Sequence, residues 1–85
     1  MEIGDKIRNI RIIKGFSQEN MAEMLKMSLV AYGDIERNKK EPKKNRLDQI
    51  ASILGVSTSD ILAFGDRVSN FFDQCGNAIG VNNGG

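Results

Sequence analysis

Half of the positively charged side chains of this sequence lie in one short stretch, RNKKEPKKNR, at residues 37 to 46. Residues 1 to 46 hold eleven Lys/Arg against seven Asp/Glu, a net charge of +4, whereas residues 47 to 85 hold one against four, a net charge of −3. Cationic side chains gathered in this way can bind a polyanion by neutralising its charges. The alternative is an ordinary solvated loop, which has the same composition.

The residue types that usually perform enzymatic or metal chemistry are nearly absent. The sequence has a single cysteine, Cys75, and no histidine, which excludes a disulfide within the chain and removes the usual zinc ligands and general base. We also find no glycine-rich phosphate loop and no paired acids at a plausible site. The sequence therefore predicts a protein that is not an enzyme, uses no cofactor and holds no metal.

Length and hydropathy indicate the class of protein. A chain of 85 residues is one domain, and a domain of this size buries about 60% of its unfolded surface. No apolar run is long enough to span a bilayer, and no leader for export opens the chain. We therefore expect a soluble, cytoplasmic protein that does not enter a membrane.

Helical spacing of apolar residues divides most of the chain into five segments. Ile3, Ile7 and Ile10 recur at this spacing in the first segment, and Gly15 follows as a helix-ending residue. The predicted helices span residues 2–14, 18 to about 25, 29 to about 37, 47–54 and 58 to about 64.

Serines with an apolar residue before them mark three of the helix starts. As N-caps, they can accept a hydrogen bond from an amide of the following turn, while the preceding side chain packs back as a hydrophobic staple. The pairs are Phe16-Ser17, Met27-Ser28 and Val56-Ser57. The second and third helices must turn sharply against each other, and Ala22 is the small residue expected where they cross.

Residues 66–85 differ from the preceding part. Val68, Phe71, Phe72 and Cys75 fall at helical spacing, and GNAIGVNNGG follows. We expect this C-terminal extension to form a short helix or a strand-like dimer arm, followed by a flexible Gly/Asn tail. The tail could equally be a linker to a continuing chain.

Together these features resemble the lambda-repressor-like, Cro-type helix-turn-helix family, also called the XRE family. The resemblance covers residues 3–64 and rests on IGDKIRNIR, GFSQENMAEML, DIERNKK and LDQIASILGVSTSDIL. It implies an all-α, five-helix DNA-binding domain at residues 1–65, with helices two and three as the helix-turn-helix. In this family the third helix lies in the major groove and the second spans the phosphate backbone.

The third predicted helix contains the residues that would read DNA. On helical spacing, Ala31, Tyr32 and Ile35 point inward, and we expect Tyr32 to pack in the core with its hydroxyl at the rim. Leu29, Val30, Gly33, Asp34 and Arg37 fall on one outward stripe, and the first four are the base contacts that the resemblance implies.

This outward face has few hydrogen-bond donors. Leu29 and Val30 can contact thymine methyl groups, Gly33 permits a close backbone approach, and Asp34 can accept from a cytosine amino group. The alternatives are that Asp34 pairs with Arg37 one turn on and that Leu29 is an exposed apolar residue with no special role.

The resemblance also implies a set of phosphate contacts: Gln18, Ser28, Arg37, Lys39, Lys40, Lys43 and Lys44. Gln18 and the free amides at the start of the second helix form a neutral, dipolar anion site. The basic loop, RNKKEPKKNR at residues 37 to 46, must supply most of the affinity, because Asp34 repels phosphates. Neutralising about six phosphates would give a slope of log affinity against log salt near −5.

Arg11 and Glu36 look like the family's pair that joins the first helix to the end of the third; the alternative is two unrelated surface charges. Three residues depart from the family pattern. Lys26 stands where glycine is usual, which would cost about 1 kcal/mol in a left-handed conformation. Asn38 replaces another glycine at little cost, and Gly33 costs a helix about 0.8–1.0 kcal/mol relative to alanine.

The functional prediction is a sequence-specific transcriptional regulator that binds double-stranded DNA and acts as a repressor, as a homodimer on a palindromic operator. The apolar candidates for the dimer interface are Leu62, Phe64, Phe71 and Phe72. The alternative is an antitoxin or another module that binds a protein partner through Leu29 and Val30. The basic loop favours DNA, because a protein partner alone does not require it.

Overall fold

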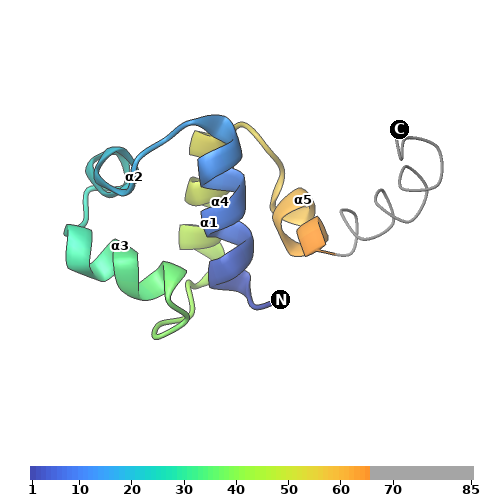
Figure 1. Cartoon of the computed structure of the whole chain (residues 1–85), viewed down its shortest axis with the longest axis horizontal. Coiled ribbons are helices and arrows are strands. Elements are labelled where there is room, and N and C mark those ends of the chain that lie inside the picture. Colours follow the sequence, from blue (N-terminus) through green and yellow to red (C-terminus); the bar gives the residue numbers. More distant parts are fainter. Residues whose placement is uncertain (66–85) are drawn as a thin grey trace, which may run out of the picture.

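The structure is a computed structural model that describes residues 1–65, and these residues form five α-helices joined by short loops. The helices are α1 (Ile3–Lys14), α2 (Gln18–Leu25), α3 (Leu29–Glu36), α4 (Lys44–Leu54) and α5 (Thr58–Leu62), shown in Figure 1. The predicted all-α, five-helix architecture is therefore confirmed. The expectations for Val68, Phe71, Phe72 and Cys75 lie outside the described residues. Among the helices of residues 1–65, none combines the length and apolar character needed to cross a membrane.

The predicted N-caps are present. The Ser17 hydroxyl accepts from the amide of Asn20 at 3.0 Å, and the Asn20 side chain accepts from the Ser17 amide, which closes a capping box. Ser28 and Ser57 accept in the same way from the amide three residues on. These caps satisfy amides that the first turn of a helix leaves without a backbone partner.

Helix α4 begins at Lys44, three residues before the predicted start at Leu47. Its first turn is polar, so the apolar periodicity on which the prediction rested does not include it. The Nη1 of Arg46 donates to the carbonyl oxygen of Leu25 at 3.1 Å, so this early turn is tied to the end of α2. A tertiary contact therefore supports helical residues that the local pattern does not identify.

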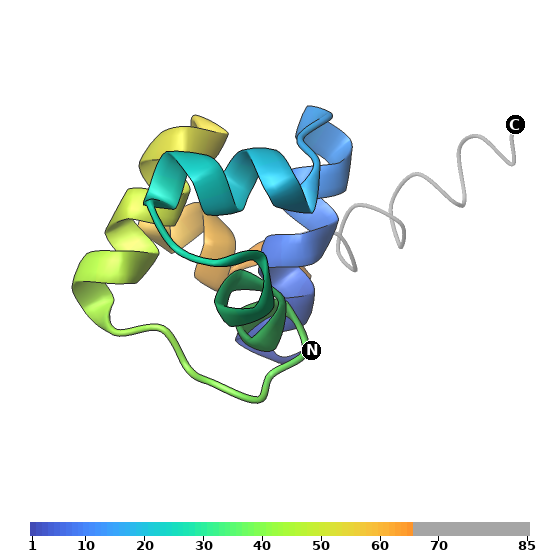
Figure 2. The same cartoon turned by 90° about the vertical axis from the view of Figure 1, so that its left-hand side faces the viewer.

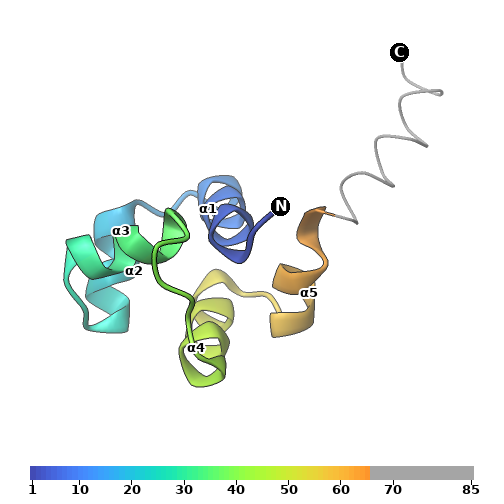
Figure 3. The same cartoon turned by 90° about the horizontal axis from the view of Figure 1, so that it is seen from below.

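One hydrophobic core is built from all five helices. Its buried side chains are Ile7, Ile10, Met21, Ala22, Leu25, Tyr32, Ile35, Leu47, Ile50, Ala51, Leu54 and Ile61. The predicted staple residues Phe16, Met27 and Val56 pack, half-buried, against it. In Figures 1 and 3, α1 and α4 occupy the middle of the molecule, with α2 and α3 on one side and α5 on the other.

The α2–α3 pair forms the helix-turn-helix. Ala22 is buried in α2, as expected for the small residue at the crossing. The chain leaves α2 through Lys26, whose φ of 57° and ψ of 46° are left-handed, in agreement with the expected strain at this residue. Figure 2 looks onto this end of the molecule, where α2 crosses above α3 and α3 is seen nearly end-on.

Candidate nucleic-acid interface

The outward face of α3 is built as the spacing predicts at its first residues. Val30 is 70% exposed and Leu29 is 43% exposed, whereas Tyr32 and Ile35 are buried in the core. Because side chains three and four residues apart share a helix face, Gly33 and Asp34 are the next positions on the face of Val30. This face therefore begins with two apolar side chains that no other helix of residues 1–65 covers.

The sequence pattern placed Gly33 among the outward residues of α3. In the structure Gly33 is buried. A Cβ placed on it would lie 2.9 Å from Nη1, 3.3 Å from Nη2 and 3.4 Å from Cζ of Arg37. The Arg37 side chain thus extends back one turn and covers the glycine. The missing side chain leaves room for the guanidinium to lie against the helix.

Asp34 pairs with Arg37, which was the alternative interpretation of this acid. The Nη2 of Arg37 donates to Oδ1 of Asp34 at 2.7 Å, and the two side chains are 53% and 34% exposed. The pair compensates the negative charge on the outward face. Its contribution to stability is small, about 0.2–0.5 kcal/mol, because exposed pairs of this spacing are screened by water.

Basic side chains border α3 on both sides. One hollow, toward the start of α2, brings together three predicted phosphate contacts, Gln18, Arg37 and Lys39. A second hollow, on the side of Ala31 and Ile35, is lined by Lys40 and Lys43. Ala31 lines the second hollow and Glu36 lines the first, and these two residues lie on opposite sides of Val30 around the helix, so the two hollows flank the outward face.

Two further basic residues belong to this surface, and sequence reasoning missed both. Arg8, an exposed residue of α1, borders the first hollow, and Arg46 borders the second. The helical spacing of Arg8 and Arg11 was the available signal for the first, since side chains three apart share a face. The predicted phosphate contact Lys44 also has a partner within the protein, because its ammonium pairs with Asp48 at 3.1 Å.

Besides Arg37 and Lys44, two more of the predicted phosphate contacts have partners within the protein. The Gln18 amide donates from Nε2 to Oε1 of Glu36 at 2.9 Å, and the Ser28 hydroxyl accepts from the Ala31 amide at 3.0 Å. Each group keeps donor capacity, because an amide nitrogen has two protons and a hydroxyl that accepts can still donate. Both remain predicted phosphate contacts, now with fixed orientations.

The predicted pair of Arg11 and Glu36 is present and is part of a larger network. The Glu36 carboxylate is almost completely buried and accepts from Nε of Arg11 at 2.6 Å and from Nη2 at 3.2 Å. It also accepts from Gln18 and, at 2.5 Å, from the hydroxyl of Tyr32. Four donors match the roughly four acceptor sites of a carboxylate, so this buried charge is fully hydrogen-bonded.

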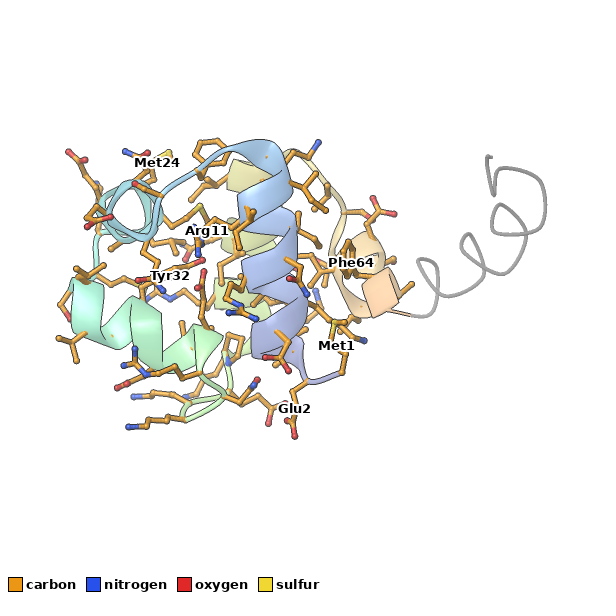
Figure 4. The ribbon with its side chains drawn as sticks, viewed as in Figure 1. Met1, Glu2, Arg11, Met24, Tyr32 and Phe64 are labelled. Atoms are coloured by element: carbon orange, nitrogen blue, oxygen red, sulfur yellow. The ribbon has the colours of Figure 1, made fainter. Side chains whose placement is uncertain are left out.

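The network also decides the protonation of its members. Burial alone would raise the pKa of the Glu36 carboxyl, but hydrogen bonds from Arg11, Tyr32 and Gln18 outweigh it and hold this pKa below its usual value. Burial, and then the Glu36 carboxylate, raises the pKa of the Tyr32 hydroxyl, which keeps its proton and donates. The Tyr32 hydroxyl is thus buried, and the expectation that it lies at the rim was wrong. Figure 4 labels Arg11 and Tyr32, which extend toward each other between α1 and α3.

A second contact fixes the end of α3 to the start of α1. Asn38, left-handed with a φ of 64°, accepts from the amide of Gly4 at 2.8 Å and donates to Asp5 at 3.3 Å. A Cβ on Gly4 would lie 2.2 Å from the carbonyl oxygen of Ile35, so only glycine permits this approach. The orientation of α3 is therefore set at its C-terminal end by α1.

Comparison with known proteins gives the same assignment for this part of the chain. Residues 7–61 match the helix-turn-helix family model. Two relatives come from Bacillus subtilis strain 168. The SPbeta prophage-derived HTH-type transcriptional regulator YonR is 39% identical over 59 residues, which are 69% of this chain and 55% of that protein. The HTH-type transcriptional regulator YazB is 33% identical over 58 residues, which are 68% of this chain and 84% of YazB.

A phage protein and two solved structures extend the comparison. The immunity repressor of Bacillus phage phi105 is 32% identical over 62 residues, 73% of this chain and 43% of the repressor. The match thus spans about half the length of YonR and less of this repressor. A crystal structure of SinR, the master regulator for biofilm formation, in complex with DNA contains a chain that is 31% identical to this one, with a TM-score of 0.65. The match covers 72% of this chain and 98% of the crystallised SinR chain. The crystal structure of the clp gene regulator ClgR from Corynebacterium glutamicum shares the fold, with 23% sequence identity and a TM-score of 0.70. The match covers 92% of this chain and 86% of the ClgR chain.

Proposed function

The chain belongs to the helix-turn-helix family of transcriptional regulators, and from this we propose that it binds double-stranded DNA with α3 in the major groove. Proteins of this family act by binding DNA and are not enzymes. The observation that supports the proposal best is the exposed outward face of α3 with basic side chains on both sides.

The dimensions of this surface fit a major groove. A helix with its side chains is about 10–12 Å across and the groove of B-DNA is about 12 Å wide, with a line of phosphates along each edge. Lys39 and Arg8 would face one phosphate line, and Lys40 and Lys43 the other. SinR, which is 31% identical, was crystallised in complex with DNA, which supports DNA binding here.

Base reading would begin at Leu29 and Val30, whose exposed methyl groups suit thymine. Phosphate binding would use the exposed lysines of the basic loop together with Gln18 and the amides at the start of α2. The lysines carry no sequence information, so they set affinity while the outward face of α3 sets specificity.

The protein would bind a palindromic operator as a homodimer. It would act as a repressor, as the name of its phi105 relative indicates for that protein. One domain of this size contacts too few base pairs for useful specificity, and the family solves this with two half-sites one helical turn apart. Leu62, which is 51% exposed, and the half-buried Phe64 are the described candidates for the interface. Figure 4 places Phe64 on the far side of the molecule from α3, so a dimer formed there would leave both α3 helices free. The protein would act in the cytoplasm, at the nucleoid.

Selection of binding sites from a randomised duplex pool at near-physiological salt tests this function. The experiment compares the unmodified chain with Val30→Gln and with Ile13→Gln, a matched control because Ile13 is 69% exposed on α1, on the face opposite Arg11. We expect an enriched palindrome whose base preference changes with Val30→Gln and not with Ile13→Gln. Enrichment of no sequence would reject the proposal.

Binding of a protein partner, as in an antitoxin, is the second candidate. It is favoured by the exposed apolar pair Leu29 and Val30. A protein partner that covers this pair would compete with DNA, so the same selection experiment separates the two functions: a protein-only module enriches no duplex sequence.

A further inference from the structure

Arg37 is placed to do more than neutralise a phosphate. It is the residue that ends α3, with a φ of −88° and a ψ of 5°, and its side chain does not extend away from the helix. Its guanidinium instead lies over Gly33 and donates to Asp34. Side chains at a helix end tend to point back toward the N-terminus, and here the absence of a Cβ on Gly33 allows the guanidinium to lie against the helix itself.

The place that the guanidinium occupies is on the outward face of α3. Gly33 and Asp34 are three and four residues after Val30, so a group that touches both lies one turn beyond Val30 on the same face. Arg37 thus supplies the side chain that residue 33 lacks. The face of α3 then consists of two apolar side chains followed by a guanidinium, and it no longer lacks hydrogen-bond donors.

On the basis of the proposed function, we propose that Arg37 is a specificity-determining residue that reads a guanine in the major groove, with Asp34 as the positioning residue that holds its guanidinium. A guanidinium presents five N–H groups in a planar fork, and the Asp34 bond takes one of them. Two of the others suffice to donate to O6 and N7 of a guanine, a match that contributes roughly 5- to 150-fold discrimination against the wrong base.

The competing role for Arg37 is a phosphate contact, and two substitutions separate the roles. Lysine keeps the positive charge but has no planar fork, so it can replace arginine at a phosphate and not at a bidentate guanine contact. Gly33→Ala places a Cβ within 2.9 Å of Nη1 and displaces the guanidinium, while leaving its charge. A base-reading Arg37 is sensitive to both changes, and a phosphate-binding Arg37 to neither.

The experiment is the site selection on the full chain, followed by affinity measurements on the selected duplex and on duplexes with one guanine replaced per half-site. The variants are Arg37→Lys, Gly33→Ala and Asp34→Asn, with Lys39→Ala as control, because Lys39 is an exposed member of the basic loop. We expect a guanine preference that falls at least fivefold in Arg37→Lys and Gly33→Ala. We expect Lys39→Ala to bind all duplexes more weakly with the base preference unchanged. Asp34→Asn should bind more tightly overall but discriminate less at the same guanine.

Three outcomes would overturn the inference, and they differ in what they leave standing. If Arg37→Lys keeps the base preference of the unmodified chain, Arg37 is a phosphate contact and the proposed function stands without this residue as a reader. A cytosine preference that only Asp34→Asn abolishes would make Asp34 itself the reader. If the unmodified chain enriches no sequence, the proposed function and this inference are rejected together.

Discussion

The guanidinium of Arg11 and the carboxylate of Glu36 are joined by two hydrogen bonds, from Nε at 2.6 Å and from Nη2 at 3.2 Å, across 25 residues of sequence. Arg11 also donates from Nη1 to the carbonyl oxygen of Phe16 at 2.8 Å, so the pair links α1, the loop before α2 and the end of α3. Because Glu36 is buried and its partner Arg11 is only 12% exposed, water cannot easily replace either one.

Arg11→Met should therefore lower the free energy of unfolding by about 3 kcal/mol, the lower end of the cost of leaving a buried charge without its ionic partner. Tyr32 and Gln18 still donate to Glu36 in this variant, which limits the loss. Urea unfolding measures it. The double variant Arg11→Met/Glu36→Met should recover much of the loss, whereas a cost below 1 kcal/mol in the single variant would identify an ordinary surface pair.

Acid stability should depend on Glu36. Its pKa in the folded protein lies below the usual 4.5, so the ionised carboxylate contributes its full stabilisation above that pH. The contribution is lost as the pH falls through the folded pKa. Unfolding free energies measured between pH 6 and pH 2 (roughly the range over which carboxyls titrate) should decline less steeply in Glu36→Gln.

Asp48 provides the control for this pH dependence. The hydroxyl of Thr58, and then the ammonium of Lys44, hold the pKa of the Asp48 carboxyl below its usual value. This carboxyl group lies at the surface, so Asp48→Asn should only slightly reduce the decline of the unfolding free energy with falling pH. An equal effect of the two substitutions would contradict the special role of the buried carboxylate.

Substitution by alanine should change the stability in opposite directions at Gly4 of α1 and Gly33 of α3. In Gly4→Ala the new Cβ meets the backbone oxygens of Ile35 and Glu36 at 2.2 and 2.8 Å, which cannot give way without moving α3. We expect a loss of about 1–3 kcal/mol, as for other overpacked sites. Gly33→Ala meets only the flexible end of Arg37 and should gain up to about 1 kcal/mol from helix propensity. Thermal unfolding of both variants tests the contrast.

Lys26 and Asn38 both have a positive φ, but glycine should help only the first. Lys26→Gly removes the left-handed strain of a side chain and should stabilise the protein by about 1 kcal/mol. Asn38→Gly also removes the hydrogen bond to the Gly4 amide, which is worth about 1 kcal/mol. It should therefore gain nothing or destabilise. A similar gain from both variants in urea unfolding would show that the Asn38–Gly4 bond contributes little.

The salt dependence of DNA binding should identify the basic loop as the phosphate contact. With about six phosphates neutralised, log affinity should fall against log salt with a slope near −5, and Lys39→Ala should reduce the slope by about 0.9. Lys14→Ala is the matched control, since Lys14 is an exposed lysine at the C-terminal end of α1. A slope that changes equally in both variants would mean that the loop has no special contact with the phosphates.

The sequence alone determined the elements whose signals are local. Serine N-caps, hydrophobic staples and C-terminal glycines act within one turn of a helix. Gly15 therefore located the end of α1, and Ser17 and Ser28 located the starts of α2 and α3, to within a residue. Apolar spacing of three and four residues similarly separated the buried face of α3 from its exposed face, where Val30 is open. Helix α4 shows the limit of such signals, because its first turn is supported by the bond from Arg46 to Leu25 rather than by a local pattern.

The tertiary structure decided how these elements present the functional surface. The Gly4–Asn38 contact joins residues 34 apart in the chain, and the four donors of Glu36 come from α1, α2 and α3. No pattern within a helix contains such distances, since each partner is fixed by the packing of another helix. The position of the Arg37 guanidinium over Gly33 is likewise a matter of side-chain conformation. An arginine side chain has many possible rotamers. In the folded protein Arg37 adopts the one in which its guanidinium lies in the space left by the missing side chain of Gly33.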